Sequence, residues 1–108
     1  MDLVGVPGRS TALARELMRL GAQFVVVGGT ARWLRGDPRP PRDLDIVVTD
    51  DEVPDLVTAL NHIGVDVTAQ RMARCRTVSL ATAFGPLDVF VAQKPASQPR
   101  DGLAVLND

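Results

Sequence analysis

A short apolar run closed by two glycines restricts most strongly what this chain can fold into. In the stretch "AQFVVVGG", residues 24–27 are Phe-Val-Val-Val, and Gly28 and Gly29 follow at once. A short β-branched run of this kind is typical of a buried strand. The segment before it, "TALARELMRLG", repeats leucine at helical spacing and ends at Gly21. A helix therefore precedes the strand, and the glycines mark the point where the chain turns.

The rest of the sequence alternates between the same two patterns. Helices are expected at residues 10–21, 30–36 and 50–64, strands at 42–49 and 65–69, and a hairpin at 76–92. Ser10 or Thr11 can cap the first helix, and Thr30 begins the second. We interpret "RMARCR" as a solvated loop that could also contact a triphosphate or an RNA, and the tail 93–108 as a loop with one helical turn. Interleaved helices and strands predict an α/β (α+β) fold, in which helices pack on the mixed sheet of a single small domain.

The bulk properties limit the cellular setting and the partners. At 108 residues the chain is long enough for one domain with one core, and its single cysteine, Cys75, cannot form an internal disulfide. The formal net charge of −1 argues against a protein that coats nucleic acid. The amino-terminal stretch lacks the pattern of a signal peptide, and no apolar run approaches the length of a membrane span. We therefore expect a cytoplasmic protein without membrane contact.

Two aspartates one residue apart begin the apolar stretch "PPRDLDIVV". Because side chains alternate along a strand, Asp43 and Asp45 project to one face and the apolar residues to the other. The hairpin strand "PLDVFV" places Asp88 in the same way, so the three carboxylates converge if these strands are neighbours. Converging carboxylates repel one another, and a divalent cation such as Mg²⁺ turns that repulsion into attraction. The alternative is that each aspartate only marks the edge of a strand.

The glycine pair lies between the first strand and the helix that follows it. Glycine lets the backbone approach a ligand closely, and the start of a helix offers unpaired N–H groups to an anion. Thr30 adds a hydroxyl, and Arg32 and Arg35 add positive charge nearby. The alternative is a plain turn, since neither the P-loop nor the dinucleotide-binding glycine pattern is present. A phosphate site beside a metal site predicts a nucleoside triphosphate as the ligand.

Together, "VVVGGTARWLRG", "PRDLDIVV" and "GPLDVF" resemble the motifs of the polymerase-β-like nucleotidyltransferase superfamily, in its small bacterial form. The resemblance covers residues 22–92, so that residues 1–108 would form one minimal nucleotidyltransferase core with a short tail, 93–108. Some of these small proteins act as the nucleotidyltransferase of a toxin–antitoxin pair. Larger members carry a further helical domain that grips the base or the acceptor.

The resemblance implies a magnesium-dependent enzyme that transfers a nucleoside monophosphate from a nucleoside triphosphate, such as ATP, to a hydroxyl group. Asp43, Asp45 and Asp88 would be the catalytic and metal-binding residues and would hold two Mg²⁺ ions, with Mn²⁺ as a substitute. Asp88 would also activate the attacking hydroxyl. The protein would contribute mainly positioning and charge neutralisation rather than a covalent intermediate.

The same resemblance implies the binding partners. Gly28 and Gly29 would hold the triphosphate, with Thr30 and Arg32 beside them. The acceptor would be a protein or an RNA, and a small helical partner protein or a homodimer would supply what larger members build from their helical domain. The alternative is a non-catalytic nucleotide-binding or regulatory partner-docking module that retains the nucleotidyltransferase core.

Overall fold

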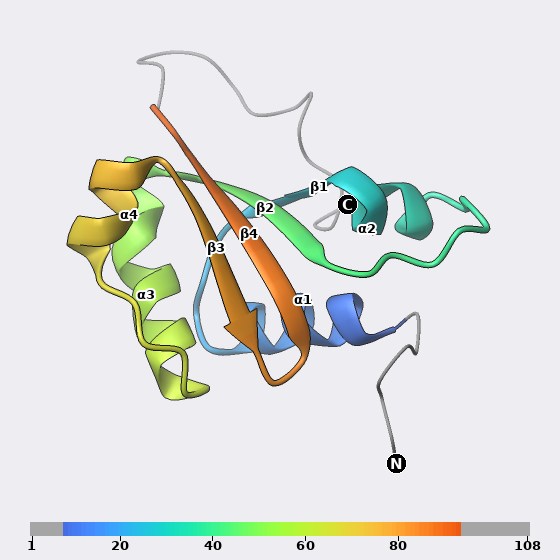
Figure 1. Ribbon diagram of the computed structural model, residues 1–108, viewed down its shortest axis with the longest axis horizontal. Coiled ribbons are helices and arrows are strands. Elements are labelled where there is room, and N and C mark those ends of the chain that lie inside the picture. Colours follow the sequence, from blue (N-terminus) through green and yellow to red (C-terminus); the bar gives the residue numbers. More distant parts are fainter. Residues whose placement is uncertain (1–7, 94–108) are drawn as a thin grey trace.

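The computed structural model describes residues 8–93, in which helices and strands are interleaved (Figure 1). In chain order these are α1 (Arg9–Arg19), β1 (Val25–Val27), α2 (Gly28–Leu34), β2 (Leu44–Thr49), the 3₁₀ turn η1 (Asp50–Glu52), α3 (Val53–His62), α4 (Ala69–Cys75), β3 (Thr77–Thr82) and β4 (Gly85–Ala92). The strands form one mixed sheet on which helices pack, so the predicted fold class is confirmed. None of the described helices is long and apolar enough to cross a membrane. The expectation for residues 94–108 lies outside the described residues.

The order of the strands brings the two aspartate-bearing strands together in the centre of the sheet. The order is β1-β2-β4-β3, with β2 and β4 parallel and the outer strands antiparallel to their neighbours. Asp45 pairs in register with Asp88 across β2 and β4. A parallel pair needs a long crossover connection, and α3, α4 and β3 supply it. The condition for the three carboxylates to converge, that β2 and β4 are neighbours, is therefore met.

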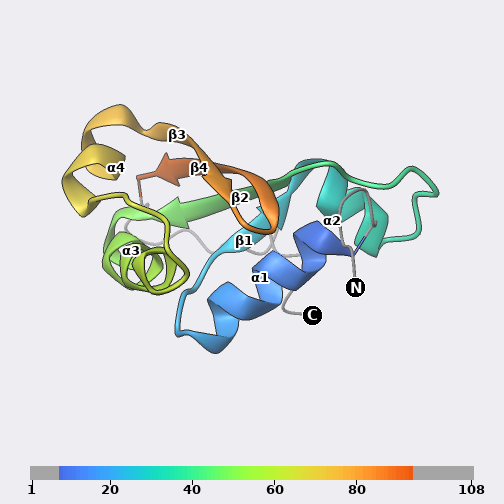
Figure 2. The same ribbon diagram turned by 60° about the horizontal axis from the view of Figure 1, so that its bottom comes forward.

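One face of the sheet carries the hydrophobic core, and α1 and α3 lie along this face (Figure 2). Every second residue of β2 and β4 points into it, as the period of a strand requires. The largest core side chains from these four elements are Leu13, Leu17, Leu44, Ile46, Val48, Leu56, Leu60, Leu87 and Val89. The side chains of Asp45 and Asp88 consequently project from the opposite face, where they are only partly buried.

The prediction that Ser10 or Thr11 caps the first helix is wrong. Helix α1 begins at Arg9 with Gly8 in the cap position, and both hydroxyl residues are buried within its first turn. Ser10 is hydrogen-bonded through its hydroxyl to that of Thr30, at 3.0 Å. The Ser10 hydroxyl therefore makes a tertiary hydrogen bond to Thr30 instead of capping the helix, as its position in the sequence had suggested.

The predicted strand at residues 65–69 is also wrong, and "RMARCR" is mostly helical rather than a loop. Val65 and Val67 are buried, but their carbonyls accept hydrogen bonds from the side-chain amide of Asn61, at 3.0 and 3.1 Å, in place of a neighbouring strand. Thr68 then caps α4 with its hydroxyl. The two valines are buried as they would be in a strand, but they lie in a loop that the side chain of Asn61 holds in place.

Candidate functional site

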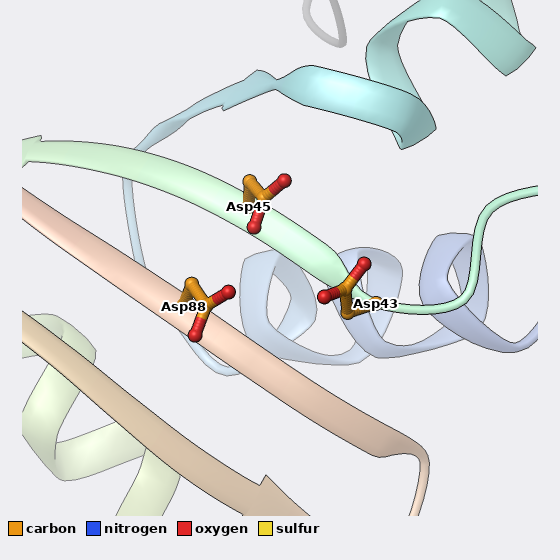
Figure 3. A group of neighbouring side chains, drawn as sticks. All are labelled: Asp43, Asp45 and Asp88. Carbon is orange, nitrogen blue, oxygen red and sulfur yellow. The ribbon is translucent and has the colours of Figure 1, made fainter.

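Three carboxylates meet on the face of the sheet opposite the core. Asp43 comes directly before β2, Asp45 lies within β2, and Asp88 lies beside it in β4 (Figure 3). Each residue offers one oxygen such that the three oxygens lie within 4.8 Å of one another. All three side chains are partly buried. The structure thus brings together the three aspartates that the sequence singles out.

The charged form of Asp45 is disfavoured in this cluster. Burial is the largest cause, followed by repulsion from Asp43 and by a hydrogen bond with Asp88, and together they raise the pKa of Asp45 from 3.8 to about 6. Arg32 opposes the shift but does not cancel it. A bound cation would remove this electrostatic cost, and carboxylate oxygens are the ligands that Mg²⁺ prefers. The residues present therefore fit a divalent cation.

Gly28 leaves room for the carboxylate of Asp45. Helix α2 begins at Gly28 rather than at the predicted Thr30, so the glycine pair forms its first turn. Gly28 has a φ of +68°, and a Cβ at this position would lie 2.3 Å from Oδ2 of Asp45. A side chain here is disfavoured both by the backbone conformation and by the lack of space. The glycine is thus tied directly to the geometry of the acidic cluster.

Thr30 faces the interior of the protein. It is fully buried, and its hydroxyl donates a hydrogen bond to the backbone carbonyl of Asp43, at 2.9 Å. Its hydroxyl is also bonded to Ser10. Because the hydroxyl is committed to these contacts, the contribution of Thr30 to the site is to hold the backbone that carries Asp43.

A pocket of about 340 Å³ adjoins the carboxylates. Its wall includes Gly29, Arg32, Arg39, Arg42, Asp43 and Asp45. Guanidinium groups beside carboxylates suit a ligand that carries phosphates and shares a cation with the protein. Arg39 and Arg42 were not singled out from the sequence, although the density of arginine in "RGDPRPPRD", between the glycine and aspartate motifs, was a usable signal.

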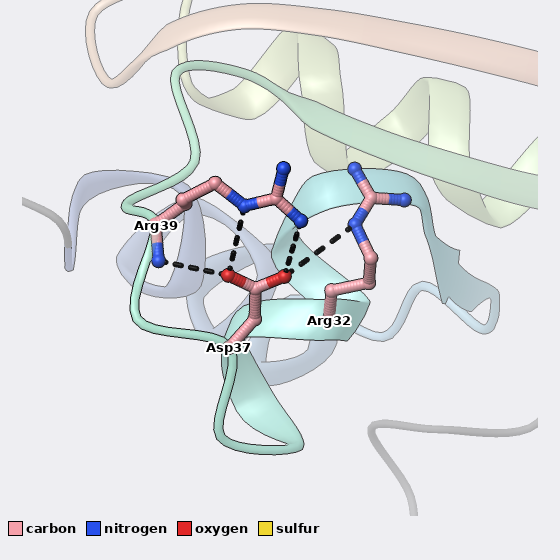
Figure 4. A network of polar contacts seen from close by, with 3 residues as sticks. All are labelled: Arg32, Asp37 and Arg39. Atoms are coloured by element: carbon pink, nitrogen blue, oxygen red, sulfur yellow. Dashed lines mark hydrogen bonds and ion pairs between the residues drawn. The ribbon is translucent and has the colours of Figure 1, made fainter.

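Asp37 holds two of these arginines at the rim of the pocket (Figure 4). Arg39 donates to its carboxylate from Nε at 3.1 Å, from Nη2 at 2.8 Å and from the backbone N–H at 2.8 Å. Nε of Arg32 lies 4.0 Å from the same carboxylate. The hydrogen bonds from Arg39 lower the pKa of Asp37 to about 2. Both arginine side chains are more than half exposed, at 57% and 81%, so their remaining N–H groups can reach a ligand.

Ser79 orients the third carboxylate from the neighbouring strand. Its hydroxyl donates a hydrogen bond to Oδ1 of Asp88, at 2.7 Å, and the two residues pair in register across β3 and β4. This contact restricts the rotation of the Asp88 carboxylate. Sequence reasoning missed Ser79, because the contact depends on the register of the hairpin rather than on any local motif.

Fold and site together define an α/β protein with an acidic cluster beside an arginine-lined pocket. Comparison with protein-family models, with curated proteins and with solved structures gives no match to this chain. The case for a function therefore rests on the geometry of the site and on the chemistry of its residues.

Proposed function

We propose that this protein is a nucleotidyltransferase that uses Mg²⁺ to move a nucleoside monophosphate from a nucleoside triphosphate to a hydroxyl of a protein or an RNA. The convergence of Asp43, Asp45 and Asp88 within 4.8 Å carries the proposal. The adjoining pocket supports it, because arginine is well suited to contact phosphate groups. The resemblance of the glycine and aspartate motifs to polymerase-β-like nucleotidyltransferases agrees with the same reaction.

Each residue of the site would have a separate role in this reaction. Asp43, Asp45 and Asp88 would hold Mg²⁺, which neutralises phosphate charge and stabilises the attacking and leaving oxygens. Arg32 would bind the outer phosphates from the rim of the pocket. Asp88 would accept the proton of the attacking hydroxyl while Ser79 keeps its carboxylate oriented. The hydroxyl oxygen forms a bond to the α-phosphorus, and the bond to the bridging oxygen breaks to release pyrophosphate.

Labelling of an acceptor tests the proposal. The purified protein is incubated with each common nucleoside triphosphate, labelled at the α-phosphate, together with Mg²⁺ and a cell lysate. A protein or an RNA should become labelled, and labelling should disappear with a chelator and in Asp43→Asn and Asp45→Asn. Asp66→Asn is a matched control, because Asp66 is exposed and lies outside the cluster. Labelling that survives both substitutions in the cluster would refute the assigned site.

A non-catalytic role gives a different result with the same protein. Calorimetry that detects Mg²⁺-dependent triphosphate binding, together with no pyrophosphate release in any lysate, would indicate a nucleotide-binding or regulatory module. Failure to bind any triphosphate in the presence of Mg²⁺ would contradict both readings of the site. Light scattering on the purified protein, alone and with a candidate helical partner, measures whether a second chain associates with it.

A further inference from the structure

A second pocket, of about 420 Å³, adjoins the first one and has no assigned role. It lies between the start of α1, the proline loop before β2 and the turn that joins β3 to β4, three segments that approach one another in Figure 1. Pro40, Pro41 and Arg42 line both pockets, so the proline loop is a common wall. A ligand in the second pocket would therefore lie next to the carboxylate site without occupying it.

Among the described residues, the charged groups that line the second pocket are all positive. They are Arg9 and Arg42, and none of the described carboxylates is in the lining. Within residues 8–93, neither arginine takes part in an ion pair. Arg9 donates from Nη2 to the carbonyl of Ala83, and its buried Nε has no hydrogen-bond partner in the part of the chain that the structure describes. Two guanidinium groups without a facing carboxylate suit a ligand that brings an anionic oxygen.

The remaining walls of this pocket are apolar and include an aromatic ring. Phe84 is half-buried at the turn between β3 and β4, and it lines the pocket together with three prolines, Pro40, Pro41 and Pro86. Bases of single-stranded nucleic acids stack on aromatic rings, and guanidinium groups contact their phosphates. An acidic peptide would use the two arginines but would leave the aromatic wall without a partner. The combination therefore favours a nucleotide unit over a peptide carboxylate.

We propose that this pocket binds one nucleotide of a single-stranded RNA, with its phosphate on Arg9 and Arg42 and its base against Phe84. The net charge of −1 means that the pocket, rather than the overall field of the protein, has to attract the RNA. Binding itself does not depend on the metal site. The interpretation of this pocket as the acceptor site rests on the proposed function. In that reaction, an RNA held in the pocket would present a hydroxyl across the proline loop to the carboxylates.

Binding of a short labelled oligoribonucleotide, followed by fluorescence anisotropy in EDTA without any triphosphate, tests this assignment. Arg42→Ala and Phe84→Ala should each weaken binding by about fivefold or more. Arg42→Ala should also lower the slope of log affinity against log salt by about 0.7, the value for one phosphate contact on a single strand. The matched controls are Arg15→Ala on α1 and Phe90→Ala on β4, which remove exposed side chains outside the pocket and should leave the affinity unchanged.

The remaining results of this experiment either support or refute RNA binding in this pocket. Circular dichroism on every variant ensures that a loss of binding is not a loss of fold, and Arg9→Lys, which keeps the charge but removes the Nε donor, should weaken binding less than Arg42→Ala. The proposal is overturned if RNA does not bind, if the control substitutions weaken binding as much as the pocket substitutions, or if an acidic peptide binds in place of RNA. Loss of RNA binding in Arg42→Ala and Phe84→Ala, in a protein that transfers no nucleotide, would refute the proposed function and support this site.

Discussion

Replacing Asp45 by asparagine should make the metal-free protein more stable while removing its proposed activity. The pKa of Asp45 is raised to about 6 by burial, by repulsion from Asp43 and by its hydrogen bond with Asp88. An ionised Asp45 therefore opposes folding at neutral pH when no cation is bound. Asparagine keeps the shape of the side chain and removes the charge, and its amide can still donate a hydrogen bond to Asp88.

The expected gain in the free energy of unfolding of Asp45→Asn follows from the pKa shift of Asp45. The pKa moves from 3.8 to about 6, and a shift of roughly two units corresponds to at most about 3 kcal/mol. Solvent screens a partly exposed side chain, so we expect about 1–2 kcal/mol. Because the folded pKa lies above the unfolded one, the wild-type protein loses stability as the pH rises from about 4 to about 6. The gain in the variant is therefore complete near about pH 8 and falls to roughly one third near about pH 4.5.

Urea denaturation in EDTA, followed by circular dichroism at these two pH values, measures the effect. A gain of about 1.5 kcal/mol would also raise the melting temperature by roughly 6–12 °C. Asp66→Asn is the control, because it removes an exposed carboxylate outside the cluster. It should change the free energy of unfolding by less than about 0.5 kcal/mol at either pH.

The reasoning is refuted if Asp45→Asn lowers the free energy of unfolding near neutral pH in EDTA. It is refuted equally if the gain is the same at both pH values, because a packing effect would not titrate. Magnesium provides a further check on the wild-type protein. At ten times its dissociation constant, Mg²⁺ should stabilise the wild type by about 1.4 kcal/mol and leave Asp45→Asn unchanged.

Two further pairs of variants test the geometry around the cluster. Gly28→Ala should lower the free energy of unfolding by about 2 kcal/mol or more, because of its positive φ and the contact with Asp45, whereas Gly29→Ala should be neutral or stabilising in urea denaturation. Thr30→Val should cost about 1–3 kcal/mol, because it leaves a partly buried carbonyl without its donor, whereas Thr58→Val, which removes an exposed contact on α3, should cost less than about 0.5 kcal/mol. Calorimetric titration with Mg²⁺ should show weaker binding in Gly28→Ala and no change in Gly29→Ala. Equal effects within either pair would contradict the contacts described for Gly28 and Thr30.

The parts of the fold that the sequence predicted are those in which local pattern and tertiary burial agree. Alternating residues such as Leu87 and Val89 repeat at the period of a strand, and a neighbouring strand is present to pair with them. Val65 and Val67 show the same alternation, but Asn61 satisfies their carbonyls and no strand forms there. The local period of apolar residues indicates which side chains are buried. Which groups bond to the backbone of those residues depends on the tertiary structure.

The same distinction applies to the candidate site, in which local pattern identifies some residues and only the tertiary structure places the others. Asp45 and Asp88 stand out in sequence because a carboxylate interrupts an otherwise apolar strand pattern, and that pattern also assigns them to one face. Thr30 could not be placed, because a hydroxyl beside a glycine pair has the same local pattern whether it faces a ligand or the core. The contact of Ser79 with Asp88 depends on the register of the hairpin, which no short motif encodes. The run of arginines in the proline loop indicates positive charge there, but not that Arg42 lines the pocket.

The glycine motif and the aspartate motif are connected by direct contacts. Val27 pairs with Asp45 across β1 and β2, Gly28 leaves space for the carboxylate of Asp45, and Thr30 holds the carbonyl of Asp43. A ligand that shifts the start of α2 must therefore also shift the carboxylates, and a cation on the carboxylates must act back on α2. Such coupling is reciprocal, so a triphosphate in the pocket and Mg²⁺ on the cluster should raise each other's affinity by the same factor. This reciprocity follows from thermodynamic linkage, and it would hold whether a bound nucleotide is transferred or only sensed.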